Sequence, residues 1–162
     1  MTMSTVEEIS KMIEQLYTID RIITAMQKKP HTYEGVRLYA NEAHTLKAIA
    51  EEEGISQAAL SDRMIRTKGA TSVMVDKLVE KGLVLRERER GNQRRYLLTL
   101  TDKGRRVNAA HLAFDMAHAD DLALALELSE AELSTVNRTL QKTIRFYSER
   151  YLPDGQCIAV PD

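Results

Sequence analysis

The spacing of apolar side chains predicts a long amphipathic helix near the N-terminus, over residues 5–27. Apolar residues recur there at intervals of three, four and seven positions, which places them on one helical face. They are Val6, Ile9, Ile13, Leu16 and Ile23. Residues 28–39 contain a proline and a glycine and lack this periodicity, so we expect them to form a loop.

Three shorter helices are predicted over residues 41–53, 56–65 and 67–82. Each begins at a side chain that favours the N-cap position, namely Asn41, Ser56 or Thr67. Glycines at positions 54 and 82 end the first and the third helix. The residues expected to face inward are Leu46, Ile49, Ala50, Leu60, Met64, Thr71, Met74, Val75 and Leu78.

At Leu83 the period of the sequence pattern changes from the roughly 3.6 residues of a helix to the two residues of a strand. Residues 83–90, LVLRERER, follow a period of two, with basic and acidic side chains alternating from Arg86 onward. Residues 95–100 form a second run that is compatible with a strand. A Gly-Asn turn lies between them, over residues 91–94. Two such runs around a tight turn predict a β-hairpin.

Two long helices complete the pattern, over residues 101–126 and 129–151. The second begins with SEAE, a capping box in which Ser129 and Glu132 satisfy each other's backbone N–H groups. Its apolar positions are Leu133, Val136, Leu140, Ile144, Tyr147 and Tyr151. The tail, residues 153–162, shows no such periodicity.

This order of elements predicts a mainly α fold with a small β-hairpin. We expect a winged helix-turn-helix lobe flanked by N- and C-terminal dimerisation helices. The expected limits are 1–40 for the N-terminal helix and loop, 41–104 for the lobe, 105–152 for the C-terminal helices and 153–162 for the tail. The outer helices carry more apolar surface than so small a lobe can cover, which predicts a homodimer.

The net charge of −1 averages two unlike regions. From Leu60 to Asn108 there are 13 Lys and Arg against 6 Asp and Glu, a balance of +7, and the remainder has 10 against 18, a balance of −8. A basic region on an otherwise acidic protein is typical of a surface that binds a polyanion. A solvated basic face without a partner remains the alternative on charge alone.

Composition and motifs exclude several classes of protein. No apolar run reaches the roughly 18 residues that a membrane-spanning helix needs, and the acidic start of the chain is unlike a secretory signal. The single cysteine, Cys157, cannot form an internal disulfide. We therefore expect a cytoplasmic protein without contact to a membrane. No phosphate-binding loop, dinucleotide fingerprint, nucleophile elbow or HExxH motif occurs, so we expect no catalytic residues and no cofactor.

From His44 to Gly104 the sequence resembles the MarR family of bacterial regulators. Residues 75–84, VDKLVEKGLV, match the family pattern that closes the recognition helix and enters the wing, and residues 100–104, LTDKG, match the segment after the wing. The chain departs from the family in two places. Asn92 stands at the wing tip, where the family usually has an Asp that orients an Arg, and Arg66 stands where it usually has an aliphatic residue.

The resemblance implies that the protein binds double-stranded DNA at a near-palindromic operator and represses transcription. The helix beginning at Thr67 would enter the major groove, and the wing would reach the minor groove. A protein-interaction module of winged-helix shape is the alternative. The residues implied in DNA binding are Ser56, Gln57, Arg66, Thr67, Lys68, Ser72, Val73, Lys77, Arg88, Arg90, Arg94 and Arg95.

The alternation of Arg and Glu along residues 86–90 has a second explanation. Arg86, Arg88 and Arg90 are predicted to share one face of the strand, with Glu87 and Glu89 on the other. Such a ladder can form ion pairs across strands and serve only to keep the hairpin soluble.

In the family, a small effector usually binds between the dimerisation helices and the DNA-binding lobe. The candidate lining here is Leu16, Ile19, Ile23, His44, Val107, His111 and Phe114, which is compatible with an apolar effector. A zinc- or redox-responsive regulator is the alternative. His44, His111 and His118 favour zinc but are not spaced as a compact ligand motif, and Cys157 lies in the tail, so we assign no metal site.

Overall fold

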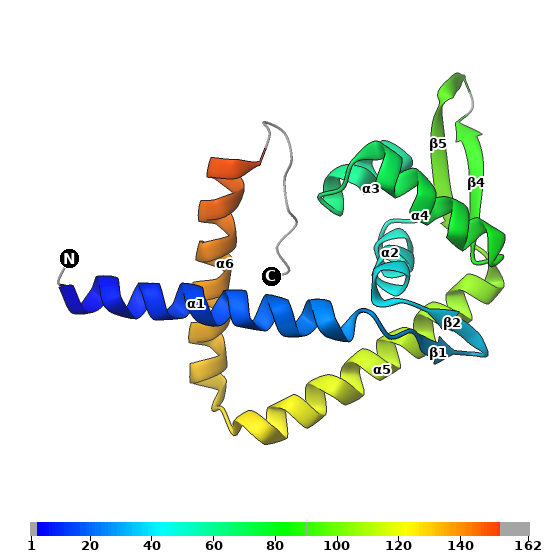
Figure 1. Cartoon of the computed structure of the whole chain (residues 1–162). Helices are drawn as coiled ribbons and strands as arrows, with labels where there is room; N and C mark the ends of the chain where they lie inside the picture. The colour runs from blue at the N-terminus through cyan, green and yellow to red at the C-terminus, as the bar shows by residue number, and fades with distance from the viewer. Residues whose placement is uncertain (1–2, 90, 153–162) are drawn as a thin grey trace.

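The computed structural model describes residues 3–89 and 91–152, without the side chains of residues 3, 93 and 94. A helical arm, a winged lobe and two further long helices follow one another along the chain (Figure 1). The elements are α1 (Met3–Met26), β1 (His31–Tyr33), β2 (Val36–Leu38), α2 (Ala40–Glu51), β3 (Ile55–Ser56), α3 (Gln57–Arg63), α4 (Lys68–Glu80), β4 (Val84–Glu89), β5 (Asn92–Leu100), α5 (Asp102–Leu126) and α6 (Glu130–Tyr151).

The winged helix-turn-helix is confirmed. Helices α2, α3 and α4 pack against an antiparallel sheet of order β3-β5-β4, and β4 and β5 project from it as the wing (Figure 1). The inward residues of each helix form one core with the sheet, because their 3.6-residue spacing gathers them on one side. Its largest fully buried members include Leu46, Ile49, Leu60, Leu78, Leu83 and Leu98.

Hydroxyl side chains cap four of the helices that the structure describes, α3, α4, α5 and α6, and the sequence predicts the caps at Ser56, Thr67 and Ser129. The hydroxyl oxygens of Ser56, Thr67 and Thr101 each accept a hydrogen bond from the backbone N–H three positions later. These donors are Ala59, Ala70 and Gly104, at 3.1, 3.2 and 2.9 Å. Each bond satisfies a donor that the first turn of a helix leaves without an intrahelical partner. The capping box at Ser129 is also present, since Glu132 accepts the Ser129 N–H at 2.9 Å.

The prediction of a loop over residues 28–39 is wrong. β1 and β2 form a hairpin there, and its turn places Glu34 and Gly35 at φ values of 49° and 76°. Positive φ at both central residues gives the turn a twist that suits a two-residue hairpin. Tyr33 and Leu38 face the core. Each strand has only three residues, too few for an alternating pattern to stand out in the sequence.

Two other boundaries differ from the predictions. α2 is capped at Tyr39 rather than at Asn41, because the carboxylate of Glu42 reaches back to accept the Tyr39 N–H at 2.9 Å. In the wing, β5 already begins at Asn92, within the predicted turn, and a register shift lies between Arg88 and Glu89. β3, which the sequence did not predict, pairs with β5 on its other side.

The start of α5 lies directly against the junction between α4 and β4. A Cβ atom on Gly104 would lie 2.0 Å from the carbonyl oxygen of Leu83, so only glycine fits this close approach. Two side chains join the same junction: Thr101 donates its hydroxyl to the Gly82 carbonyl at 2.7 Å, and Lys103 bonds the Lys81 carbonyl at 2.8 Å. The LTDKG segment thus fixes where the wing meets the long helix.

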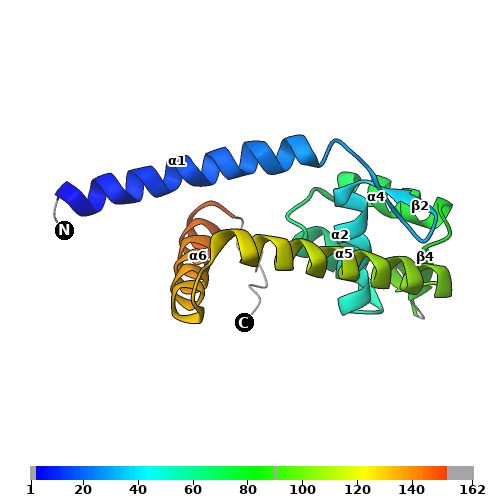
Figure 2. The same ribbon diagram turned by 90° about the horizontal axis from the view of Figure 1, so that it is seen from below.

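The core extends beyond the predicted limits of the lobe on both sides. Tyr33 and Leu38 of the hairpin and Val107 of α5 belong to the same buried cluster as α2 and α4. The remainder of α5, with α1 and α6, projects away from the lobe, and Figure 2 shows α1 separated from α6. Within the part of the chain that the structure describes, no helix combines the length and hydrophobicity that a bilayer crossing requires.

Candidate nucleic-acid interface and adjoining pocket

Helix α4 presents one face to the core and the opposite face to solvent. Thr71, Val75 and Leu78 are buried, whereas Lys68, Val73 and Lys77 are exposed and Ser72 is half-buried. Val73 is 57% exposed, an apolar side chain on an otherwise polar face. The residues that the sequence assigned to DNA on this helix therefore lie on its free side.

A surface hollow of about 240 Å³ joins α4 to the wing and to the start of α3. Three of the predicted DNA-binding residues line it together: Gln57 from α3, Lys68 from α4 and Arg95 from β5. The side-chain oxygen of Gln57 is buried and has no hydrogen-bond partner among the described residues. Segments nearly 40 positions apart in the sequence thus meet at one hollow, which carries the basic side chains of Lys68 and Arg95.

The wing is tied to α4 and to itself by its arginines. Arg86 donates to Asp76 of α4 at 2.6 Å. Arg86 and Arg88 both lie over the ring of Tyr96, 5.4 and 5.6 Å from its centroid, so they share a face of the strand as predicted. Arg95 pairs with Glu89 across the hairpin at 3.1 Å, which is one pair of the alternative Arg–Glu ladder.

Two of the predicted DNA contacts in the wing, Arg90 and the side chain of Arg94, fall outside what the structure describes, so their prediction rests on the sequence.

Ser56 and Arg66 are placed differently from what the sequence predicts. Ser56 is 6% exposed and its hydroxyl caps α3, so we leave it out of the candidate interface. Arg66 is half-buried. Its guanidinium donates to Thr45 at 2.8 Å and to Asn41 at 3.1 Å, and burial lowers the pKa of this guanidinium.

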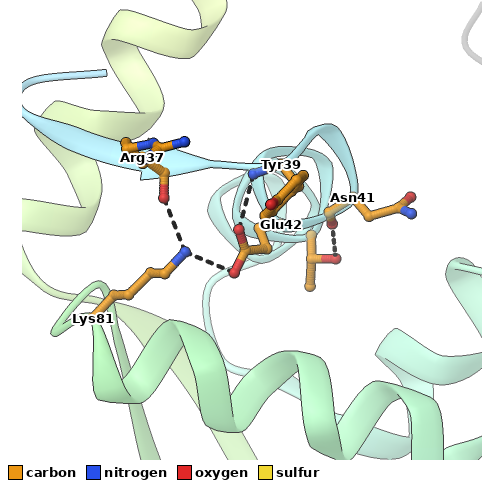
Figure 3. Close-up of polar contacts among 6 residues, drawn as sticks. Arg37, Tyr39, Asn41, Glu42 and Lys81 are labelled. Atoms are coloured by element: carbon orange, nitrogen blue, oxygen red, sulfur yellow. Dashed lines mark hydrogen bonds and ion pairs between the residues drawn. The ribbon is translucent and has the colours of Figure 1, made fainter. Parts of the chain in front are cut away.

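The first turns of α2 hold both ends of α4. At one end, Arg66 precedes the cap of α4 and bonds α2 through Asn41 and Thr45. At the other, Lys81 follows the last turn of α4 and lies 2.7 Å from the buried carboxylate of Glu42 (Figure 3). Any displacement of α2 would therefore act on α4 at both of its ends.

Some of the residues predicted to line an effector pocket surround one cavity. A cavity of about 210 Å³ lies between the end of α1, β1, the start of α2 and the middle of α5. Four of the seven predicted residues line it: Ile23, His44, His111 and Phe114. Of the other three, Leu16 lines a separate cavity of about 760 Å³ beside α6, Val107 is fully buried in the core, and Ile19 is exposed.

Sequence reasoning missed several residues of this pocket, among them His31, Tyr33 and Asp115. His31 and Tyr33 lie on the unpredicted hairpin. Asp115 lies one helical turn after His111, a spacing that could have identified it. Burial lowers the pKa of His111, with Asp115 opposing this effect, so the imidazole is held in its neutral form.

Comparison with known proteins identifies the winged lobe. The profile of the MarR family matches residues 38–96, from the end of β2 to the middle of the wing. The transcriptional regulator HosA of Escherichia coli O127:H6 is 32% identical over 88 residues, which cover 54% of this chain and 65% of that protein. Residues 38–96 of this chain are therefore similar to the MarR family.

Further likenesses extend beyond these residues. A putative transcriptional regulatory protein for the hcr operon of Thauera aromatica is 33% identical over 104 residues, 64% of this chain and 61% of that protein. The match thus spans less than two thirds of either relative. In fold, the chain resembles Streptococcus pneumoniae FabT, solved in complex with DNA, with a TM-score of 0.67 at 20% identity over 89% of this chain and 98% of that one.

Proposed function

We propose that this protein is a homodimeric, sequence-specific DNA-binding repressor of the MarR type rather than an enzyme. The observation that carries the proposal is the surface on which Gln57, Lys68 and Arg95 meet, between the exposed start of α4 and the wing. The names of the relatives support it, since HosA and the Thauera protein are both described as transcriptional regulators. So does the fold, which is shared with a protein solved on DNA.

The two reading elements would divide the work. The start of α4 would enter the major groove, where Lys68 and Ser72 can bond base edges or phosphate and Val73 can contact a thymine methyl group. Lys77 would contact the backbone. The wing, with Arg88 and Arg94, would follow the minor groove, where negative potential attracts arginine. The arginines held over Tyr96 keep the wing's basic face in a defined position.

A second copy of the chain would cover the outer helices. Helix α6 has no buried residue, and its apolar stripe is 36–68% exposed from Leu133 to Tyr151. α1 also exposes Ile19, Ile22 and Met26. Apolar faces of this extent are unusual on a monomer. Two-fold pairing would present two copies of α4 and so predicts a near-palindromic operator.

The proposal is tested by sequencing the fragments of its own genome that the full chain retains at about 0.15 M salt, the ionic strength at which specific binding is best compared. We expect enrichment of a near-palindrome with half-sites about one helical turn apart. Lys68→Ala should lose the enrichment, whereas Lys142→Ala, on α6, should keep it. The proposal would be contradicted if both variants retained random sequences, or if the wild type retained no DNA.

A further inference from the structure

Three potential metal ligands converge in the pocket between α2 and α5. The ligand atoms of His44, His111 and Asp115 all lie within 4.8 Å of one another. His44 comes from α2, and the other two lie one turn apart on α5. His44 is exposed and Asp115 is half-buried, so both can rotate toward a common centre, while His111 is held in place.

His111 is a buried imidazole without a hydrogen bond. It is 2% exposed, and neither Nδ1 nor Nε2 has a partner among the described residues. The nearest carboxylate oxygen, Oδ1 of Asp115, lies 3.5 Å from Nδ1, and the ring of His44 lies 5.5 Å from that of His111, centre to centre. A buried polar group left without a partner is unfavourable, because it has lost its bonds to water and gained none in the protein. A bound ion would supply the missing partner.

The donor set selects the kind of ion. Two imidazoles and a carboxylate suit first-row transition metals such as zinc and are too poor in oxygen for calcium or magnesium. Tetrahedral Zn²⁺ with ligands at about 2.0–2.2 Å needs its donor atoms closer together than the 4.8 Å within which the three lie here, a change that side-chain rotation can provide. We propose that His44, His111 and Asp115 form a transition-metal site, with Zn²⁺ as its best-fitting ion and water completing the coordination.

Such an ion would join α5 to the helix that holds the candidate recognition helix. His44 lies two positions from Glu42 and one from Thr45, the residues through which α2 bonds Lys81 and Arg66 at the two ends of α4. An ion held by His44 and by the two residues of α5 would tie α2 to α5 and, through these bonds, restrict the position of α4. This consequence rests on the proposed DNA binding, whereas the site itself does not.

Metal binding is measured on the full chain after chelator treatment, by titration with Zn²⁺ and by the visible absorption of Co²⁺. We expect one ion per chain and Co²⁺ bands of four-coordinate type. His44→Ala and Asp115→Asn should each lower Zn²⁺ affinity by at least the roughly 10- to 100-fold that loss of an outer-shell partner costs. Asp120→Asn, the same change at an exposed position of α5, should leave it unchanged.

Two results would overturn the site. One is equal Zn²⁺ affinity of Asp115→Asn and Asp120→Asn, and the other is six-coordinate Co²⁺ bands that His44→Ala leaves intact.

DNA binding is measured separately, with and without Zn²⁺. We expect Zn²⁺ to change DNA affinity by roughly 5- to 150-fold in the wild type and not in Asp115→Asn. A metal-binding protein with no DNA affinity in either state would contradict the proposed function and leave the site standing. DNA affinity indifferent to Zn²⁺ would overturn the coupling.

Discussion

The ammonium of Lys81, at the C-cap of α4, lies 2.7 Å from Glu42 Oε1 in the first turn of α2 (Figure 3). The Glu42 side chain is 5% exposed, and its other oxygen accepts the Tyr39 N–H. Lys81 also donates to the carbonyl of Arg37 at 2.9 Å. One pair of charges therefore joins the β1–β2 hairpin, the start of α2 and the end of α4.

Removal of Lys81 should destabilise the fold, because it leaves the carboxylate of Glu42 buried without its counter-charge. We expect Lys81→Met to lower the free energy of unfolding by about 2–3 kcal/mol, less than the roughly 3–5 kcal/mol of a fully buried pair, since Lys81 is 31% exposed. Urea unfolding of Lys81→Met, Glu42→Gln and the double variant gives the coupling. Additive single effects would show that the pair contributes nothing.

The steric role of Gly104 is tested by a matched pair of glycines. Gly104→Ala places a Cβ 2.0 Å from a backbone oxygen, so we expect it to cost more than about 2 kcal/mol of unfolding free energy. Gly69, in the first turn of α4, has open space around it, and Gly69→Ala should stabilise by up to about 1 kcal/mol. Equal thermal midpoints for the two variants would refute the close approach.

DNA binding should depend strongly on salt, because each phosphate neutralised by Lys or Arg releases a counterion. With about 6–10 phosphate contacts, affinity should fall on the order of 10³- to 10⁵-fold between 50 and 200 mM salt. Fluorescence anisotropy over that range measures the slope. An affinity that does not change would show that the basic surface of α4 and the wing is not where DNA binds.

The recognition helix and the wing should differ in how they affect specificity. Arg94→Ala is expected to weaken binding to all sequences, with a bias against A·T-rich flanks, because a wing arginine responds to groove potential. Lys68→Ala should also weaken binding. Ser72→Ala and Val73→Ala should cost about 1–3 kcal/mol only at the base pairs they contact. In competition binding, equal effects of Arg94→Ala and Ser72→Ala on operator and scrambled DNA would refute this division.

The dimer should depend on the apolar stripe of α6. Leu140 is 38% exposed, and Leu140→Glu would place a charge in the proposed interface, where an unpaired charge is costly. Light scattering at micromolar concentration should give twice the 18.4 kDa chain mass for the wild type and the chain mass for Leu140→Glu. Lys142→Glu, on the opposite face of the helix, should remain dimeric. A monomeric wild type would contradict the proposal.

Much of the winged lobe could be predicted from the sequence, because the interactions that specify it are local. The helix boundaries follow from caps such as Ser56 and Thr67, whose hydroxyls bond N–H groups three residues away. The change of period at Leu83 is likewise local, since side chains alternate along a strand whatever the rest of the chain does. These short-range rules were sufficient for the order of helices and wing and for the outward face of α4.

Tertiary structure decided the features that join distant segments. His44 and Asp115 are 71 positions apart, and Glu42 and Lys81 are 39 apart. No local pattern pairs such residues, because it is the packing of α2 against both α4 and α5 that brings them together. The same packing turned Arg66 back onto α2, and Ser56 is buried where β3 pairs with β5. Sequence periodicity determines which face of a helix is buried, whereas the element packed against that face decides which polar groups meet there.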